Sequence, residues 1–103
     1  MRLTEFNYRG QATIKEDIDF SLSKEEQIWS LNQNVMHVTY DSDLLLDVGW
    51  TNEFETEGFF QVNIIKGGDW DDPILLENVR FDDLPGRLVE LIGFIESYGA
   101  DLK

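Results

Sequence analysis

The sequence predicts an α+β fold: one antiparallel sheet of about four to five strands, with a C-terminal amphipathic helix and a short helix from the N-terminal half packed on one face. The runs 44–50 and 59–65 alternate apolar and polar residues, as strands covered on one side do. Residues 84–98 place apolar side chains at helical spacing instead. A length of 103 residues suits one hydrophobic core, so residues 1–103 are expected to form a single domain.

The first third of the chain gives mixed signals. Residues 3–8 are short, aromatic and half alternating, which predicts a strand. Residues 13–22 fit either period, so their type stays open. Ser23, followed three residues later by Glu26, matches a capping box and predicts a short helix. The apolar side of that helix would be formed by Ile28, Trp29 and Leu31.

The middle of the chain predicts successive strands. Residues 35–40 and 44–50 are β-rich runs joined by a tight polar turn. Residues 59–65 repeat the alternating pattern, and residues 74–80 fit a further strand after Pro73. One face of this sheet is apolar and the other is mixed, as in an antiparallel sheet covered on a single side.

The C-terminal segment predicts a helix lying against the sheet. Asp82 and Asp83 can cap its start, Pro85 is tolerated in its first turn, and Gly99 suits its exit. Gly93 falls inside it, where a close approach of helix to sheet would explain a glycine. The residues expected to face the sheet are Leu84, Leu88, Leu91, Ile92, Ile95 and Tyr98.

The charge distribution is the main functional signal. The chain has a net charge of −13, and between Asp41 and Asp83 it carries twelve acidic residues against only Lys66 and Arg80. A folded surface with such a field is suited to docking a basic protein. Direct binding of nucleic acid is disfavoured, because phosphate contacts need clustered cations and the eight Lys and Arg residues are scattered.

Several function classes lose support from composition. The absence of cysteine excludes disulfides, thiolate metal sites and cysteine nucleophiles. No signal peptide or membrane-spanning run is visible, so a cytoplasmic protein with no membrane partner is expected. His37 is the lone histidine and has no nucleophile motif to serve. We therefore expect no catalytic residue, no cofactor and no enzyme activity.

The first candidate binding loop runs from residue 51 to residue 58. It alternates three glutamates with an aromatic residue, and the candidate partner-binding residues are Glu53, Phe54, Glu55 and Glu57. The loop is longer than a tight hairpin needs, and binding residues are enriched in loops. The alternative is a solvated loop in which Phe54 folds back onto the core.

The second candidate loop lies between residues 67 and 73. An indole flanked by carboxylates resembles an interface hot spot, and the candidate partner-binding residues are Asp69, Trp70, Asp71 and Asp72. One alternative is a structural turn stabilised by the aspartates. Calcium is another, but the spacing departs from an EF-hand loop, whose twelfth position would be Arg80 here, so no metal site is expected.

The order of three motifs resembles a known class of proteins. Residues 47–50 (DVGW), residues 58–62 (GFFQV) and residues 69–73 (DWDDP) together resemble small immunity proteins of bacterial polymorphic toxin systems, including contact-dependent growth inhibition. The resemblance covers residues 44–80. It implies a cytoplasmic protein that neutralises a cognate toxin domain, frequently a nuclease, by blocking its active site or substrate path. Contact residues and oligomeric state do not follow from it.

Two other functions are compatible with the composition. An acidic nucleic-acid mimic or regulatory adaptor would bind a host protein that handles nucleic acid, using the same charge complementarity. A small hydrolase or metal-dependent enzyme would use clustered carboxylates and would bind divalent cations tightly. Calorimetry with calcium, magnesium or manganese separates this last function from the others.

Overall fold

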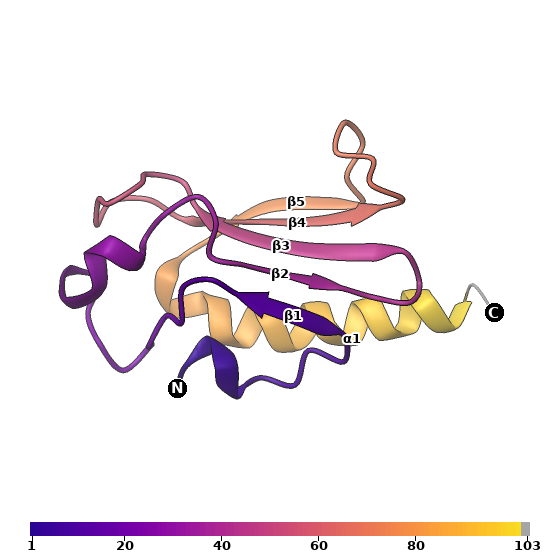
Figure 1. Ribbon diagram of the computed structural model, residues 1–103, viewed down its shortest axis with the longest axis horizontal. Coiled ribbons are helices and arrows are strands. Elements are labelled where there is room, and N and C mark those ends of the chain that lie inside the picture. Colours follow the sequence, from indigo (N-terminus) through magenta and orange to yellow (C-terminus); the bar gives the residue numbers. More distant parts are fainter. Residues whose placement is uncertain (102–103) are drawn as a thin grey trace.

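The computed structural model describes residues 1–101, with side chains as far as Tyr98, as a five-stranded antiparallel sheet and a long helix on one face of it (Figure 1). The strands are β1 (Gln11–Ile14), β2 (Met36–Thr39), β3 (Leu44–Trp50), β4 (Phe60–Lys66) and β5 (Leu75–Val79). The helices are the 3₁₀ turns η1 (Leu3–Glu5), η2 (Glu25–Ser30) and η3 (Phe81–Asp83), and α1 (Leu84–Asp101). The predicted α+β fold is confirmed.

The five strands lie side by side in chain order, and each is antiparallel to its neighbour. The register places Val38, Leu46 and Ile64 in one cross-strand row on the inner face. His37 and Asp47 belong to a row on the outer face, which is mixed in polarity. The alternation in the sequence therefore identified the two faces correctly.

The core lies between the inner face of the sheet and α1. The residues of α1 that are buried there are Leu84, Leu88, Leu91, Ile92 and Ile95, and Tyr98 packs partly against them. At the end of the sheet where β3 stops and β4 starts, the ring of Phe60 lies 5.0 Å from the ring of Trp50 and 5.7 Å from that of Phe81, measured between centroids. This aromatic cluster fixes the base of the β3–β4 loop.

Gly49 lets the backbone at Gln33, in the segment that precedes β2, pack directly against β3. A Cβ at Gly49 would stand only 2.1 Å from the carbonyl oxygen of Gln33, so no side chain fits there. The Trp50 backbone N–H holds this segment in place by donating to the Asn32 carbonyl at 2.8 Å. As a result, η2 is held beside the β3–β4 loop.

The prediction of a strand at residues 3–8 is wrong. The segment begins with η1, where the Arg2 N–H donates to the Glu5 carboxylate at 2.6 Å. Leu3 and Tyr8 are both buried, and the Tyr8 hydroxyl donates to the Leu3 carbonyl at 2.6 Å. Residues five apart would face opposite sides of a strand, whereas the turn directs both into the core.

The capping box predicted for the short helix is present. The Glu26 N–H donates to Ser23 Oγ at 3.2 Å, and the Ser23 N–H donates to the Glu26 carboxylate at 3.4 Å. The helix itself is η2, a 3₁₀ element that is broken at Gln27, where φ is −133°. The Gln27 side chain donates to the Asp19 carbonyl and accepts from the Asp19 N–H, which ties η2 to the preceding loop.

Three details expected for the C-terminal helix are corrected. Asp82 and Asp83 form the turn η3 instead of capping α1 with their side chains. The helix continues past Gly99 as far as Asp101. Gly93 is exposed, and a Cβ placed on it would meet nothing within 4 Å, so no close approach to the sheet requires this glycine.

We expect Gly93→Ala to raise the free energy of unfolding by about 1 kcal/mol, because alanine loses less backbone entropy in a helix and finds open space here. Urea unfolding measures the change. Gly68→Ala is the matched control: its Cβ would also be free of contacts, but its φ of +71° penalises any side chain. Equal effects at the two positions would contradict this account of Gly93.

Candidate functional site

The eight residues predicted to bind a partner lie at two opposite ends of the sheet (Figure 1). Because β3, β4 and β5 are antiparallel neighbours, the β3–β4 loop (51–59) and the β4–β5 loop (67–74) leave the sheet at opposite ends. The first loop carries Glu53, Phe54, Glu55 and Glu57, and the second carries Asp69, Trp70, Asp71 and Asp72. The fold does not bring the two groups together.

The β3–β4 loop is ordered by its own hydrogen bonds. The indole N–H of Trp50 donates to the Glu55 carbonyl at 2.8 Å, and the Asn52 side-chain amide donates to the Glu57 carbonyl at 2.7 Å. The first of these bonds starts from a buried ring of the core. The backbone that carries the glutamates is therefore positioned before any partner arrives, which reduces the ordering cost of binding.

Phe54 stands on the surface beside Trp29 of η2. The Phe54 N–H donates to the Leu31 carbonyl at 2.7 Å, which fastens the loop to the end of η2. The two rings are tilted by 58° with centroids 5.4 Å apart, and Trp29 and Phe54 are 75% and 42% exposed. Phe54 therefore does not fold back onto the core. We call Trp29 and Phe54 the aromatic pair.

The backbone at Phe54 is in the left-handed region, with φ of +62°. This conformation is uncommon for a bulky residue and costs roughly 1–2 kcal/mol relative to an ordinary one. The bond to Leu31 and the contact with Trp29 hold the strained residue in place. The loop thus presents an aromatic ring to solvent at a conformational cost, a feature that functional sites often show.

Seven carboxylates lie at the same end of the molecule as the aromatic pair. Two are on η2, three are in the β3–β4 loop and two are in η3: Glu25, Glu26, Glu53, Glu55, Glu57, Asp82 and Asp83. We call these seven carboxylates, together with the aromatic pair, the acidic end. Within residues 1–101, none of these seven forms an ion pair. Their negative field is therefore available to a cationic partner.

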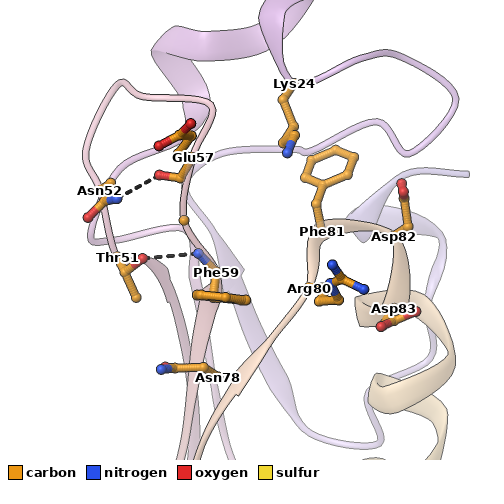
Figure 2. A pocket seen from close by; sticks show the side chains of 11 residues that line it. Lys24, Thr51, Asn52, Glu57, Phe59, Asn78, Arg80, Phe81, Asp82 and Asp83 are labelled. Carbon is orange, nitrogen blue, oxygen red and sulfur yellow. Dashed lines mark hydrogen bonds between the residues drawn. The ribbon is translucent and has the colours of Figure 1, made fainter.

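A cleft of about 860 Å³ opens at the acidic end, between the β3–β4 loop and η3 (Figure 2). Figure 2 shows Thr51, Asn52, Glu57 and Phe59 on one side and Arg80, Phe81, Asp82 and Asp83 on the other, with Lys24 above Phe81. Lys24 and Arg80 form no ion pair with another described residue. The cleft therefore offers both signs of charge, with carboxylates in excess.

The opposite end is a simpler surface. The Gly67–Gly68 turn has φ values of +60° and +71°, and the residues that follow it are exposed. Trp70 is 53% exposed. The Gly67 N–H donates to the Asp43 carbonyl at 3.0 Å, which places the β2–β3 turn beside this loop. At this end the rings of Phe94 and Tyr98 in α1 lie 6.1 Å apart between centroids, and the Lys66 ammonium lies 5.6 Å from the Tyr98 ring. Among the described residues, Trp70 itself belongs to no aromatic pair.

His37 and Asp47 lie opposite each other on the outer face, in β2 and β3. His37 is half-buried. Burial raises the pKa of Asp47, while the nearby charges of His37 and Lys15 work against that rise. An aspartate with a higher pKa in the folded protein binds its proton more tightly there, so its ionisation lowers stability as the pH climbs above the unfolded value of about 3.9.

Replacing Asp47 with asparagine is expected to raise the free energy of unfolding at pH 7, because the buried charge is removed. The gain should vanish near pH 3, where the aspartate is protonated in both states. Urea unfolding at the two pH values measures it. A loss of stability at pH 7 would mean that the attraction to His37 and Lys15 outweighs desolvation.

Sequence reasoning missed Trp29 as a surface residue. Its position between Ile28 and Leu31 suggested the apolar side of a helix, but Leu31 is buried and Trp29 is 75% exposed. The 3₁₀ geometry and the break at Gln27 change which residues share a face. A neighbouring pair of glutamates, Glu25 and Glu26, was the available hint that this turn lies in solvent.

No protein-family model, curated protein or solved structure matches the chain. Among residues 1–101, no helix combines the length and hydropathy needed to cross a membrane. The same residues contain no group of three or more His, Asp and Glu side chains placed to hold a metal ion.

Proposed function

We propose that this protein is the immunity protein of a bacterial toxin system: a non-enzymatic inhibitor that binds a basic toxin domain, such as a nuclease, through the acidic end. One observation carries the proposal. Carboxylates without ion-pair partners among the described residues share one end of the molecule with an ordered, exposed aromatic pair. The motif order that resembles immunity proteins supports it from the sequence.

The charges of the acidic end suit a protein that competes with nucleic acid. A nuclease must attract a polyanion and so carries a basic cleft, which aligned carboxylates can occupy instead. Electrostatic steering of this kind can raise association rates to about 10⁸–10⁹ M⁻¹s⁻¹ at low salt. Rapid capture is what protection against a toxin requires.

The aromatic pair adds an apolar surface that a partner can bury. Binding energy at interfaces is concentrated in a few buried aromatic and arginine residues, surrounded by contacts that exclude water. Trp29 and Phe54 are already packed together in the free protein, so a partner that covers them gains apolar burial at small entropic cost. Arginine side chains of a basic partner can also stack on their faces.

An interface of ordinary size would cover a small part of this protein's surface. A standard interface buries about 800 Å² on each partner, and the protein exposes 6080 Å² in total. A patch centred on the aromatic pair can reach the cleft between the β3–β4 loop and η3. The β4–β5 loop, at the opposite end of the sheet, is then left outside the contact.

Co-production with the toxin domain encoded by the neighbouring upstream gene tests the proposal. We expect a stable complex in purified form and restored growth of cells that make the toxin. An unrelated basic nuclease is the control and should be neither bound nor neutralised. Absence of both binding and rescue would end the proposal, and capture of a host protein that handles nucleic acid would favour the nucleic-acid mimic or adaptor.

A further inference from the structure

The sheet ends in a strand with a free edge. Within residues 1–101, β5 pairs with β4 alone, since the strand order is β1-β2-β3-β4-β5. No hydrogen bond joins the backbone of Leu75–Val79 to any other described segment. Such an edge presents a row of N–H and C=O groups to which another strand can bind.

A groove of about 580 Å³ runs along this edge. Four consecutive residues, 77–80, line it, although their side chains alternate between the two faces of the sheet. The cavity therefore follows the backbone edge of the strand. The opposite wall is formed by η3 and the start of α1, where a Cβ on Gly86 would meet nothing within 4 Å.

The charges along the groove favour a basic occupant. Arg87 is already bound by the carboxylate of Glu77, with Nη2 donating at 3.0 Å, and it also faces Glu90 at 3.4 Å. Asp82 and Asp83 on the same wall form no ion pair with a described residue. A second copy of this chain is a poor occupant, because each copy carries a net charge of −13.

The groove is continuous with the acidic end. Asn78, Arg80, Asp82 and Asp83 line both this groove and the cleft beside the β3–β4 loop. Beside the edge, Leu76 is 57% exposed on the outer face, where a side chain of an added strand would cover it. One partner can thus occupy both surfaces without crossing a gap.

We propose that the free edge of β5 takes an extended, lysine- or arginine-bearing segment of the basic partner, which adds as a sixth strand and places alternate side chains in the groove beside α1. Main-chain hydrogen bonds supply affinity, and Asp82 and Asp83 select basic side chains. The identity of the partner rests on the proposed function. The free edge of β5 and the groove beside it are observed independently of that function.

A synthetic peptide tests this strand addition without the toxin. The probe is a capped peptide of about six residues that alternates lysine and valine, the length of an ordinary strand. Two control peptides carry N-methyl groups on either the lysines or the valines, which preserves charge and removes one set of backbone donors. Amide NMR of the labelled protein should show shifts along β5, with one methylated peptide binding at least about tenfold more weakly than the parent.

Two protein variants complete the experiment. Gly86→Leu should fill the groove and weaken binding of the parent peptide at least about tenfold, because Gly86 faces open space on the groove wall. Gly93→Leu, also free of contacts but outside the groove, is the matched control and should leave binding unchanged. Equal binding of all three peptides, or shifts confined to residues 53–57, overturns the inference.

The outcome also separates this inference from the proposed function. Toxin neutralisation together with no peptide binding at β5 removes strand addition and leaves the immunity role intact. Peptide binding at β5 with no toxin binding removes the immunity role and retains a basic-peptide edge on this protein.

Discussion

Reversing three charges in the β3–β4 loop, by Glu53→Lys, Glu55→Lys and Glu57→Lys together, is expected to slow association with the basic toxin domain by at least about tenfold at low salt. The substitutions replace negative charge at the acidic end with positive charge, so the partner is repelled where it was attracted. Stopped-flow association rates measured across a salt series report the change. The salt dependence should flatten as well.

The fold supplies a matched control for this experiment. Asp69→Lys, Asp71→Lys and Asp72→Lys make the same change in net charge at the opposite end of the sheet. At physiological ionic strength the Debye length is about 8 Å, whereas β4, the strand that joins the two loops, spans roughly 20 Å at about 3.3 Å a residue. The control should therefore retain most of its association rate at that salt. Equal slowing by both triple variants would show that net charge matters and position does not.

Trp29→Ala is expected to weaken toxin binding by at least about 2 kcal/mol, or roughly 30-fold, as truncation of an interface hot spot does. The indole is 75% exposed in the free protein, so its removal should cost little stability. It also leaves the ring of Phe54 without its neighbour. Calorimetric titration of the variant with the toxin domain measures the affinity, and urea unfolding measures the stability.

Trp70→Ala is the control for the aromatic substitution. Trp70 is 53% exposed and lies in the β4–β5 loop, away from the aromatic pair. The Trp70→Ala variant should bind the toxin domain with the same affinity as the unmodified protein. If Trp29→Ala lowers the free energy of unfolding and leaves the affinity unchanged, the aromatic pair is a structural contact that fastens η2 to the loop.

The regular elements of the middle and C-terminal parts of the chain could be predicted because their periodicity is strong. In β3, the buried set Leu44, Leu46, Val48 and Trp50 repeats every second residue. In α1, apolar residues recur at three and four positions and become buried against the sheet. The first third of the chain has no such period. Its turns are held by individual hydrogen bonds of side chains such as Gln27 and Tyr8. No periodicity in the sequence predicts these bonds.

The grouping of the charges could not be predicted, because it depends on strand order. A loop composition shows that Glu53 and Asp69 are exposed, but only the antiparallel pairing of β3, β4 and β5 shows that they leave the sheet at opposite ends. The same pairing places Asp82 of η3 across the cleft from Glu57, although they are far apart in sequence. The candidate surface therefore gained Trp29 and the carboxylates of η2 and η3 only from the structure.

The tryptophan side chains offer the most direct test of the acidic end as the binding surface. Trp29 lies in the aromatic pair, Trp50 in the core and Trp70 at the opposite end, so their indole N–H signals in an NMR spectrum of the labelled protein report from three separate places. On addition of the unlabelled toxin domain, we predict that the Trp29 signal shifts while the Trp70 signal stays where it was. A shift of Trp70 with an unmoved Trp29 would contradict the account.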